Sequence, residues 1–220
     1  NMKKLITSIL SVFLLTSAAY SFDRPGISIG GSATAAYFST SAHEVEASEK
    51  SEEVDGAALG GYTSVFAEIT LADRLSIGVS FVPEDLETET VETKQTDETT
   101  SDSGSAVTNT IKASLEDMTT IYASLLLTDN LYVKFGVVSL DLVTQESLGT
   151  GSAYGNTDLD GDTFGVGYNM EMDNGVFLRA EAMRTNLGGV SLTSTTNSDN
   201  KVVLSDVEGV NASIMIGKKF

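Results

Sequence analysis

The chain has 220 residues, no cysteine and a formal net charge of −18, from 13 basic and 31 acidic residues. The lack of cysteine excludes disulfides, thiolate metal sites, cysteine nucleophiles and a lipoprotein anchor. The acidic balance argues against nucleic acid as a partner. A helical membrane protein is also excluded, because no apolar run after residue 20 reaches the roughly 20 residues that a spanning helix needs.

The first 21 residues have the three parts of an export signal. Two lysines near the start precede an apolar run over residues 5–15, and small residues follow it. This order of charged start, short apolar segment and small-residue exit is typical of a signal peptide. We expect a signal peptide at 1–21, cleaved before Phe22 or alternatively after Ala19, and a single domain at 22–220.

Apolar and polar residues alternate with period two along most of the remaining chain. This alternation places every second side chain on the same face of a β-strand. In 131–137, the apolar face holds two valines, a leucine and a phenylalanine, and the opposite face holds Tyr132, Lys134 and Gly136. The pattern predicts eight strands, at Gly26–Phe38, Gly61–Leu71, Leu75–Pro83, Met118–Thr128, Leu131–Val143, Thr163–Met172, Val176–Leu187 and Asp206–Phe220.

Short and long connections alternate between these strands. The three short ones are rich in Asp, Asn and Gly, which suit tight hairpin turns. The four long ones cover 39–60, 84–117, 144–162 and 188–205. In an up-and-down barrel alternate connections lie on the same side, so all long loops fall on one side and both termini on the other. The sequence therefore predicts an all-β, eight-stranded antiparallel up-and-down transmembrane β-barrel with long outer loops.

Two segments leave the strand count open. Residues 190–192 and 201–204 are apolar and flank a turn-like Asn-Ser-Asp-Asn sequence. We expect them to form a hairpin that continues the last two strands beyond the membrane. Counting them as spanning strands would give a ten-stranded barrel with two very short spans. Most of 84–117 is rich in Glu and Thr and is expected to be solvated and irregular.

The final strand ends on an aromatic residue with apolar residues at alternate positions. These residues are Phe220, Ile216, Ile214 and Ala212, while Lys218 interrupts the series. The arrangement resembles the assembly signal of outer-membrane barrels. Together with strands such as FGVGYNMEM and FLRAEAMRT, it makes residues 22–220 similar to the small outer-membrane β-barrel superfamily, which includes the transmembrane domain of OmpA.

The resemblance implies a location and a set of partners. We expect the outer membrane of a Gram-negative bacterium, with both termini periplasmic. Outer-membrane lipid, lipopolysaccharide, the barrel-assembly machinery and periplasmic chaperones are the implied partners, and the extracellular partner stays unknown. The peptidoglycan-binding domain that follows the OmpA barrel is not expected here, so tethering to the cell wall is not implied.

Five charged residues are expected on the inward face of the barrel: Glu68, Lys134, Glu171, Arg179 and Glu181. Charges confined to a narrow lumen must pair, and an eight-stranded barrel is only wide enough for its own side chains. We expect ion pairs that plug the lumen, with Arg179 at the centre. The alternative is a minimal porin for small solutes or cations, for which inward glycines such as Gly78 and Gly167 would leave room.

Two further features are weak candidates for chemistry. His43, the one histidine, is expected to be a surface residue, so no catalytic residue and no enzyme activity is predicted. The oxygen-bearing residues Asn156, Asp158, Asp160 and Asp162 are spaced as in a calcium loop, but the twelfth position is Gly167 instead of Glu. Loosely bound calcium is the only cofactor this pattern suggests, and a solvated turn is the alternative.

Overall fold

A computed structural model of the chain describes residues 26–46, 49–50, 54–72, 74–87, 91–96, 106–147 and 152–220. The expected signal peptide at 1–21 and the turn residue Asp73 lie outside these ranges. Within them, no helix is long and apolar enough to cross a membrane. The strands are β1 (Ile27–Glu46), β2 (Glu49–Lys50), β3 (Val54–Ala72), β4 (Leu75–Phe81), β5 (Leu86–Glu87), β6 (Val91–Thr96), β7 (Ala106–Leu126), β8 (Leu131–Ser147), β9 (Thr157–Glu171), β10 (Val176–Leu187), β11 (Val190–Thr193), β12 (Lys201–Leu204) and β13 (Val207–Lys219).

Eight of these strands close into a barrel. The order of hydrogen-bonded neighbours is β1-β13-β10-β9-β8-β7-β4-β3, and β3 pairs back onto β1 along Ile27–Ala42. All of these pairings are antiparallel. The predicted all-β, eight-stranded up-and-down barrel is therefore confirmed. Closure leaves the strands of the ring without an exposed edge over the height at which all eight are present.

The wall of the barrel has an apolar outer face. Side chains at alternate positions on most strands of the ring point away from the lumen, as the alternation of buried and exposed residues shows for β9, β10 and β13. Many of the exposed ones are large and apolar, among them Phe135, Val137, Phe164, Val166, Tyr168, Met170, Val210, Ile214 and Ile216. A continuous band of this kind is unusual on a soluble monomer and typical of a surface that faces lipid.

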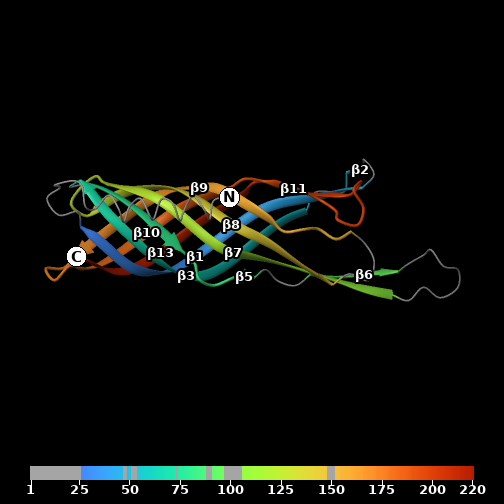
Figure 1. Ribbon diagram of the computed structural model, residues 1–220, viewed down its shortest axis with the longest axis horizontal. Helices are drawn as coiled ribbons and strands as arrows, with labels where there is room; N and C mark the ends of the chain where they lie inside the picture. The colour runs from blue at the N-terminus through green and yellow to red at the C-terminus, as the bar shows by residue number, and fades with distance from the viewer. Residues whose placement is uncertain are drawn as a thin grey trace, which may run out of the picture.

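The barrel has a turn end and a loop end. The turn end carries the short connections, including 173–175, where Gly175 adopts a positive φ of 80° and Asn174 Oδ1 accepts a hydrogen bond from Val176 N. The C-terminal residue Phe220 lies at the same end (Figure 1). The long connections lie at the opposite end, so the predicted sorting of short and long connections is observed.

Strands of the ring such as β7 continue past the barrel at the loop end, where the short strand β6 pairs with β7 (Figure 1). The sequence placed the start of β3 at Gly61 and of β7 at Met118, whereas they start at Val54 and Ala106. The expectation of irregular loops was wrong for these segments. Ladder hydrogen bonds to β1 and β8 hold them extended, and such pairing does not require apolar alternation. The expected hairpin is confirmed, because β11 pairs with β12, which in turn pairs with β1.

A β-bulge changes the phase of β7 partway along its length. Asp117 has a positive φ of 54°, and the register with β8 shifts between Glu116 and Thr119. Asp tolerates this left-handed conformation better than most residues. Because of the extra residue, Leu115 and Met118 both pack on the inward apolar cluster, although their spacing would put them on opposite faces of a regular strand.

Candidate functional site: the filled lumen

Arg179 on β10 and Glu68 on β3 form an ion pair inside the barrel. Arg179 Nη1 donates to both carboxylate oxygens of Glu68, at 2.8 and 2.7 Å, and Arg179 Nε donates to Asn169 Oδ1 at 3.0 Å. The guanidinium carbon lies 4.2 Å from the centroid of the Phe177 ring. The Glu68 side chain is only 3% exposed, so Arg179 supplies the opposite charge that a buried carboxylate needs.

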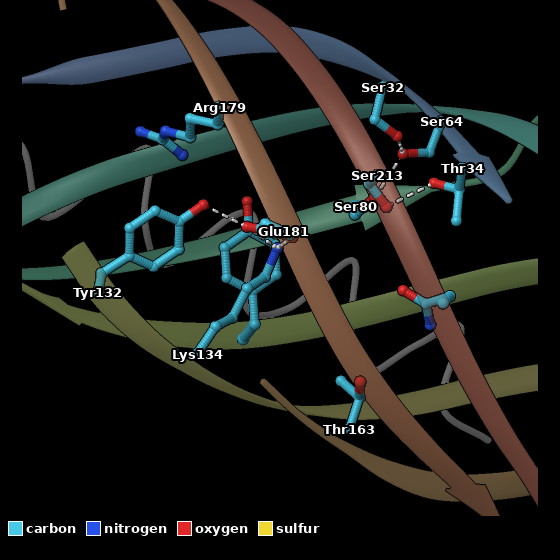
Figure 2. A network of polar contacts seen from close by, with 12 residues as sticks. Ser32, Thr34, Ser64, Ser80, Tyr132, Lys134, Thr163, Arg179, Glu181 and Ser213 are labelled. Atoms are coloured by element: carbon cyan, nitrogen blue, oxygen red, sulfur yellow. Dashed lines mark hydrogen bonds and ion pairs between the residues drawn. The ribbon is translucent and has the colours of Figure 1, made fainter. Parts of the chain in front are cut away.

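Lys134 on β8 and Glu181 on β10 form a second pair. Lys134 Nζ lies 2.9 and 3.1 Å from the two oxygens of Glu181, and Tyr132 donates its hydroxyl to Glu181 Oε1 at 2.6 Å. Figure 2 shows Tyr132 and Lys134 both directed at the Glu181 carboxylate. Tyr122 links the two pairs. Its hydroxyl donates to Glu68 Oε1 at 3.0 Å, and the centroid of its ring lies 3.8 Å from Lys134 Nζ.

We call Glu68, Tyr122, Tyr132, Lys134, Arg179 and Glu181 the charge layer. Its members come from β3, β7, β8 and β10, so the contacts cross the lumen from different parts of the wall. Two cations face two carboxylates, and the charges balance. The hydroxyl groups of Tyr122 and Tyr132 donate further hydrogen bonds to the two carboxylates, and Asn169 accepts one from Arg179. Buried ion pairs are tolerated when such additional hydrogen bonds satisfy the charged groups. Such a network fills the lumen with fixed polar contacts.

The structure places four of the five predicted inward charges in this layer, but not Glu171. Glu171 is at the turn end, 41% exposed, with its carboxylate 3.6 Å from Lys219 Nζ. The partner of Arg179 is Glu68, rather than Glu171 or Glu181. Tyr122 and Tyr132 were missed as participants. The signal was present for Tyr132, because alternation places it on the same inward face as Lys134.

The inward glycines make room for aromatic rings instead of a pore. A Cβ on Gly78 would lie 2.6 Å from Tyr122 Cζ and 2.8 Å from Glu68 Cγ. The Tyr132 ring lies against Gly167 in the same way, and the Phe66 ring lies against Gly30. Glycine allows this close approach because it has no side chain. At these three glycines, aromatic rings take up the space that the sequence offered to a porin.

A layer of hydroxyl groups lies next to the charge layer on its loop-end side. Ser32 and Ser64 share a hydrogen bond of 2.7 Å, Ser80 donates to Ser64 at 3.1 Å, and Thr34 and Ser213 share one of 2.8 Å, as Figure 2 shows. They line part of a cavity of about 80 Å³, whose other walls include Lys134 and Glu181 as well as the apolar side chains Val138, Leu140 and Leu187. Since a buried water needs roughly 10–15 Å³ of such space, the cavity has room for a few water molecules.

An apolar layer lies in the lumen further toward the loop end. We call it the apolar collar. Its buried members are Val82, Met118, Val138, Leu140, Leu159 and Leu187, with Tyr62, Leu86, Leu115, Leu142, Val190 and Val207 packed against them. These residues come from six of the eight barrel strands and from the adjoining segments 82–86 and β11. The collar was not predicted from the sequence, which drew attention only to charges on the inward face.

The residues of the predicted assembly signal lie on the outer face of β13. Ile214, Ile216 and Phe220 are exposed large apolar residues, and Ala212 is exposed on the same face. The backbone N–H of Phe220 donates to Ile27 O at 2.8 Å, at the seam where β13 meets β1. Their role in assembly stays a prediction.

The calcium-loop interpretation was wrong about local structure. Asp158, Asp160 and Asp162 belong to β9, which begins at Thr157 directly after Asn156. The three carboxylates are exposed at alternate positions of an extended strand, so they are spread along it and do not converge on one point. Among the described residues, no group of three or more acidic, histidine or cysteine side chains could hold a metal ion.

His43 is part of β1 and is half-buried, rather than lying in a surface loop. Its Nδ1 is buried and has no hydrogen-bond partner in the described part of the chain. A general base needs a partner that fixes its orientation, and the described residues provide none at this nitrogen.

Comparison with known proteins identifies the fold and no family. No protein-family model matches the chain, and no curated protein matches it either. Among solved structures, the outer membrane protease OmpT from Escherichia coli is similar at 10% identity with a TM-score of 0.51, covering 92% of this chain and 99% of that one. The outer membrane protein OprG from Pseudomonas aeruginosa has the same identity and TM-score and covers 89% and 96%. At these identities the likeness shows that the chain has the fold of small outer-membrane β-barrels.

Proposed function

We propose that the protein is an outer-membrane β-barrel with a closed lumen that serves as a structural and surface-interaction protein. The observation that carries the proposal is the filled interior. Three layers succeed one another along the lumen: the charge layer, the hydroxyl layer and the apolar collar. A solute would have to pass all three, and the first and last are made of buried, interlocked side chains.

The membrane location is supported by the outer face of the barrel. The exposed apolar band surrounds a closed ring of antiparallel strands, and strand pairing of this kind is what a structure inside hydrocarbon requires. Short turns of such barrels lie in the periplasm, so both termini would be periplasmic and the loop end would face outside. The barrel-assembly machinery and periplasmic chaperones are then the partners expected during its biogenesis.

The loop end carries exposed acidic residues just beyond the apolar band. Asp158, Asp160 and Asp162 follow one another on the outer face of β9, and Glu208 on β13 pairs with Arg184 at 3.0 Å. In the proposed orientation these groups lie at the level of lipopolysaccharide, and the acidic strands beyond them are exposed to the medium. Surface interaction is the function that this arrangement supports best.

A minimal porin is the second candidate. The cavity between the charge layer and the apolar collar favours it, because it provides space for water in the middle of the lumen. Conduction would still require both flanking layers to open. The likeness to OmpT raises the possibility of an enzyme, but we propose none, since Nδ1 of His43 has no partner among the described residues.

Two measurements test the proposal together. The protein should fractionate with the outer membrane and migrate faster on gels without heating, because a closed barrel resists detergent. Purified barrel in liposomes should give no more swelling in isotonic small sugars than protein-free liposomes. Recovery as a soluble periplasmic protein would overturn the location, and rapid swelling would favour the porin.

A further inference from the structure

The outer half of β3 has a backbone edge that no described strand covers. β3 pairs with β1 over Val54–Ile69, but its pairing with β4 begins only at Val65. Over 55–63, the described residues supply one contact to the open edge: the Glu84 carboxylate accepts hydrogen bonds from Thr63 N at 2.5 Å and Thr63 Oγ1 at 3.1 Å.

The sequence at the end of β4 explains why this edge is open. β4 ends at Phe81, and Val82 N donates to Met118 O on β7, which draws the chain away from β3. The next residue, Pro83, has no N–H and cannot continue the ladder. The wall therefore separates between β3 and β4 beyond Val65, and β1 is the one described strand with which β3 still pairs.

The direction of the hydrogen bonds identifies the free groups. Thr70 N points to β1, where it donates to Gly26 O, whereas Thr63 N points away from β1 to Glu84. Residues of odd number on β3 therefore direct both N–H and C=O to the open edge. No described residue pairs with the edge groups of Asp55, Ala57, Leu59 and Gly61.

This edge lacks the protection that exposed edges usually have. Every residue from Asp55 to Gly61 is exposed, and the side chains are small except for Leu59, which is 82% exposed. The segment contains no proline, lysine or bulge, which are the usual means of blocking strand addition. The opposite edge of the same sheet differs, because the chain directly after β11 pairs with the segment around Tyr154, where Thr195 N donates to Ala153 O and Tyr154 pairs with Ser194.

We propose that residues 55–63 of β3 receive an extended segment of another protein as an added strand. The occupant has a short apolar centre, which packs against Leu59, and basic residues on both sides. Asp55 and Glu84 stand at the two ends of the edge, separated by about 27 Å of extended chain at 3.4 Å per residue, and the whole chain carries a net charge of −18. The small side chains on both faces leave room for large ones on the partner.

A second copy of this chain fits the edge poorly. Antiparallel self-pairing about Leu59 would place Asp55 of each copy opposite Thr63 of the other, and so beside the Glu84 carboxylate bonded to it. Two pairs of like charges would then face each other, which destabilises strand pairing. A cationic partner converts the same positions into attractive ones.

The test uses full-length barrel in detergent micelles and a fluorescent synthetic peptide. The peptide has alternating valine and threonine in its centre and two lysines at each end, and binding is followed by anisotropy at physiological ionic strength. We expect saturable binding. Leu59→Pro should weaken it at least about tenfold, since the ring removes one free donor and obstructs the edge without breaking a bond to β1.

Two controls separate strand addition from charge attraction. Leu59→Thr keeps the free N–H and should weaken binding by less than about threefold. A peptide with the same charges but N-methylated at alternate central residues should not bind. Equal binding of the methylated peptide, or unchanged binding to Leu59→Pro, would overturn the proposal. A heat-modifiable gel shift verifies that each variant is folded.

The remaining outcome concerns the second copy. If Leu59→Cys forms a disulfide-linked dimer through this edge in micelles, the occupant is another copy and the proposal is wrong. The inference depends on the proposed function only in requiring that the loop end face the medium. Peptide binding is measured on purified protein. A failure to bind would therefore not contradict the membrane location or the closed lumen, and evidence against the location or the closed lumen would not contradict strand addition at this edge.

Discussion

Arg179 and Glu68 are neighbours in space although 111 residues separate them in the chain, and Arg179 Nη1 contacts both carboxylate oxygens of Glu68 within 2.8 Å. The strands that carry them, β10 and β3, are separated in the ring by β13 and β1. The pair therefore spans the lumen and connects opposite parts of the wall. Its strength is expected to affect both the stability of the barrel and its closure.

Replacing Arg179 with Ala should destabilise the barrel strongly. Removal of one partner of a buried pair leaves the other charge uncompensated and costs about 3–5 kcal/mol. Arg184→Ala is the matched control, because its pair with Glu208 is 64% and 60% exposed and should be worth less than about 1 kcal/mol. Urea unfolding in lipid vesicles measures both. Equal effects of the two substitutions would contradict the charge layer.

Gly78→Ala should destabilise the barrel by packing strain. The added methyl would meet the buried Tyr122 ring and the Glu68 side chain, and overpacking of this kind costs about 1–3 kcal/mol. Gly60→Ala is the control, since nothing lies within 4 Å of the position its Cβ would take, and should change the free energy of unfolding by less than about 0.5 kcal/mol. A neutral Gly78→Ala would show that Tyr122 can move aside and that the lumen is looser than proposed.

Cysteine labelling should establish the orientation. The chain has no native cysteine, so single substitutions report without background. Ser198→Cys, in the turn between β11 and β12, should react with a membrane-impermeant maleimide on intact cells. Asn174→Cys, in the short turn before β10, should react only after the outer membrane is permeabilised. The reverse pattern would place the loop end in the periplasm.

The barrel was predictable because alternation and loop lengths are local properties of the sequence. The extensions of β3 and β7 beyond the predicted strands could not be predicted in this way. Segments such as Gly56–Gly61 have mostly small side chains without apolar and polar alternation, and pairing with the neighbouring strand holds them extended. In the lumen, alternation identified the charged side chains but not their partners. Whether Arg179 meets Glu68 or Glu171 depends on the stagger of the strands around the ring, which no single segment encodes.

The apolar collar changes what is expected of the charge layer. From the sequence alone, Arg179→Ala predicts cation-selective openings, because inward carboxylates lose their partner. In the single variant Lys134 and Glu181 are still paired, and the collar still lies across the same path through the lumen. We therefore expect the lumen of this variant to stay mostly closed. Combining it with Leu140→Ser and Leu187→Ser should give cation-selective openings, since apolar constrictions exclude water. The two serine substitutions alone should stay closed, and steady conduction by Arg179→Ala alone would contradict the collar as a barrier.

The central claim is that the native lumen is closed, and single-channel recording of the wild-type barrel in planar lipid bilayers tests it most directly. The purified protein should insert, as verified by its heat-modifiable migration after recovery from the same vesicles, and should give at most rare and brief openings over a bare-bilayer baseline. A steady, large conductance that is unchanged by Arg179→Ala would show an open lumen, contradict the closed barrel and favour the porin.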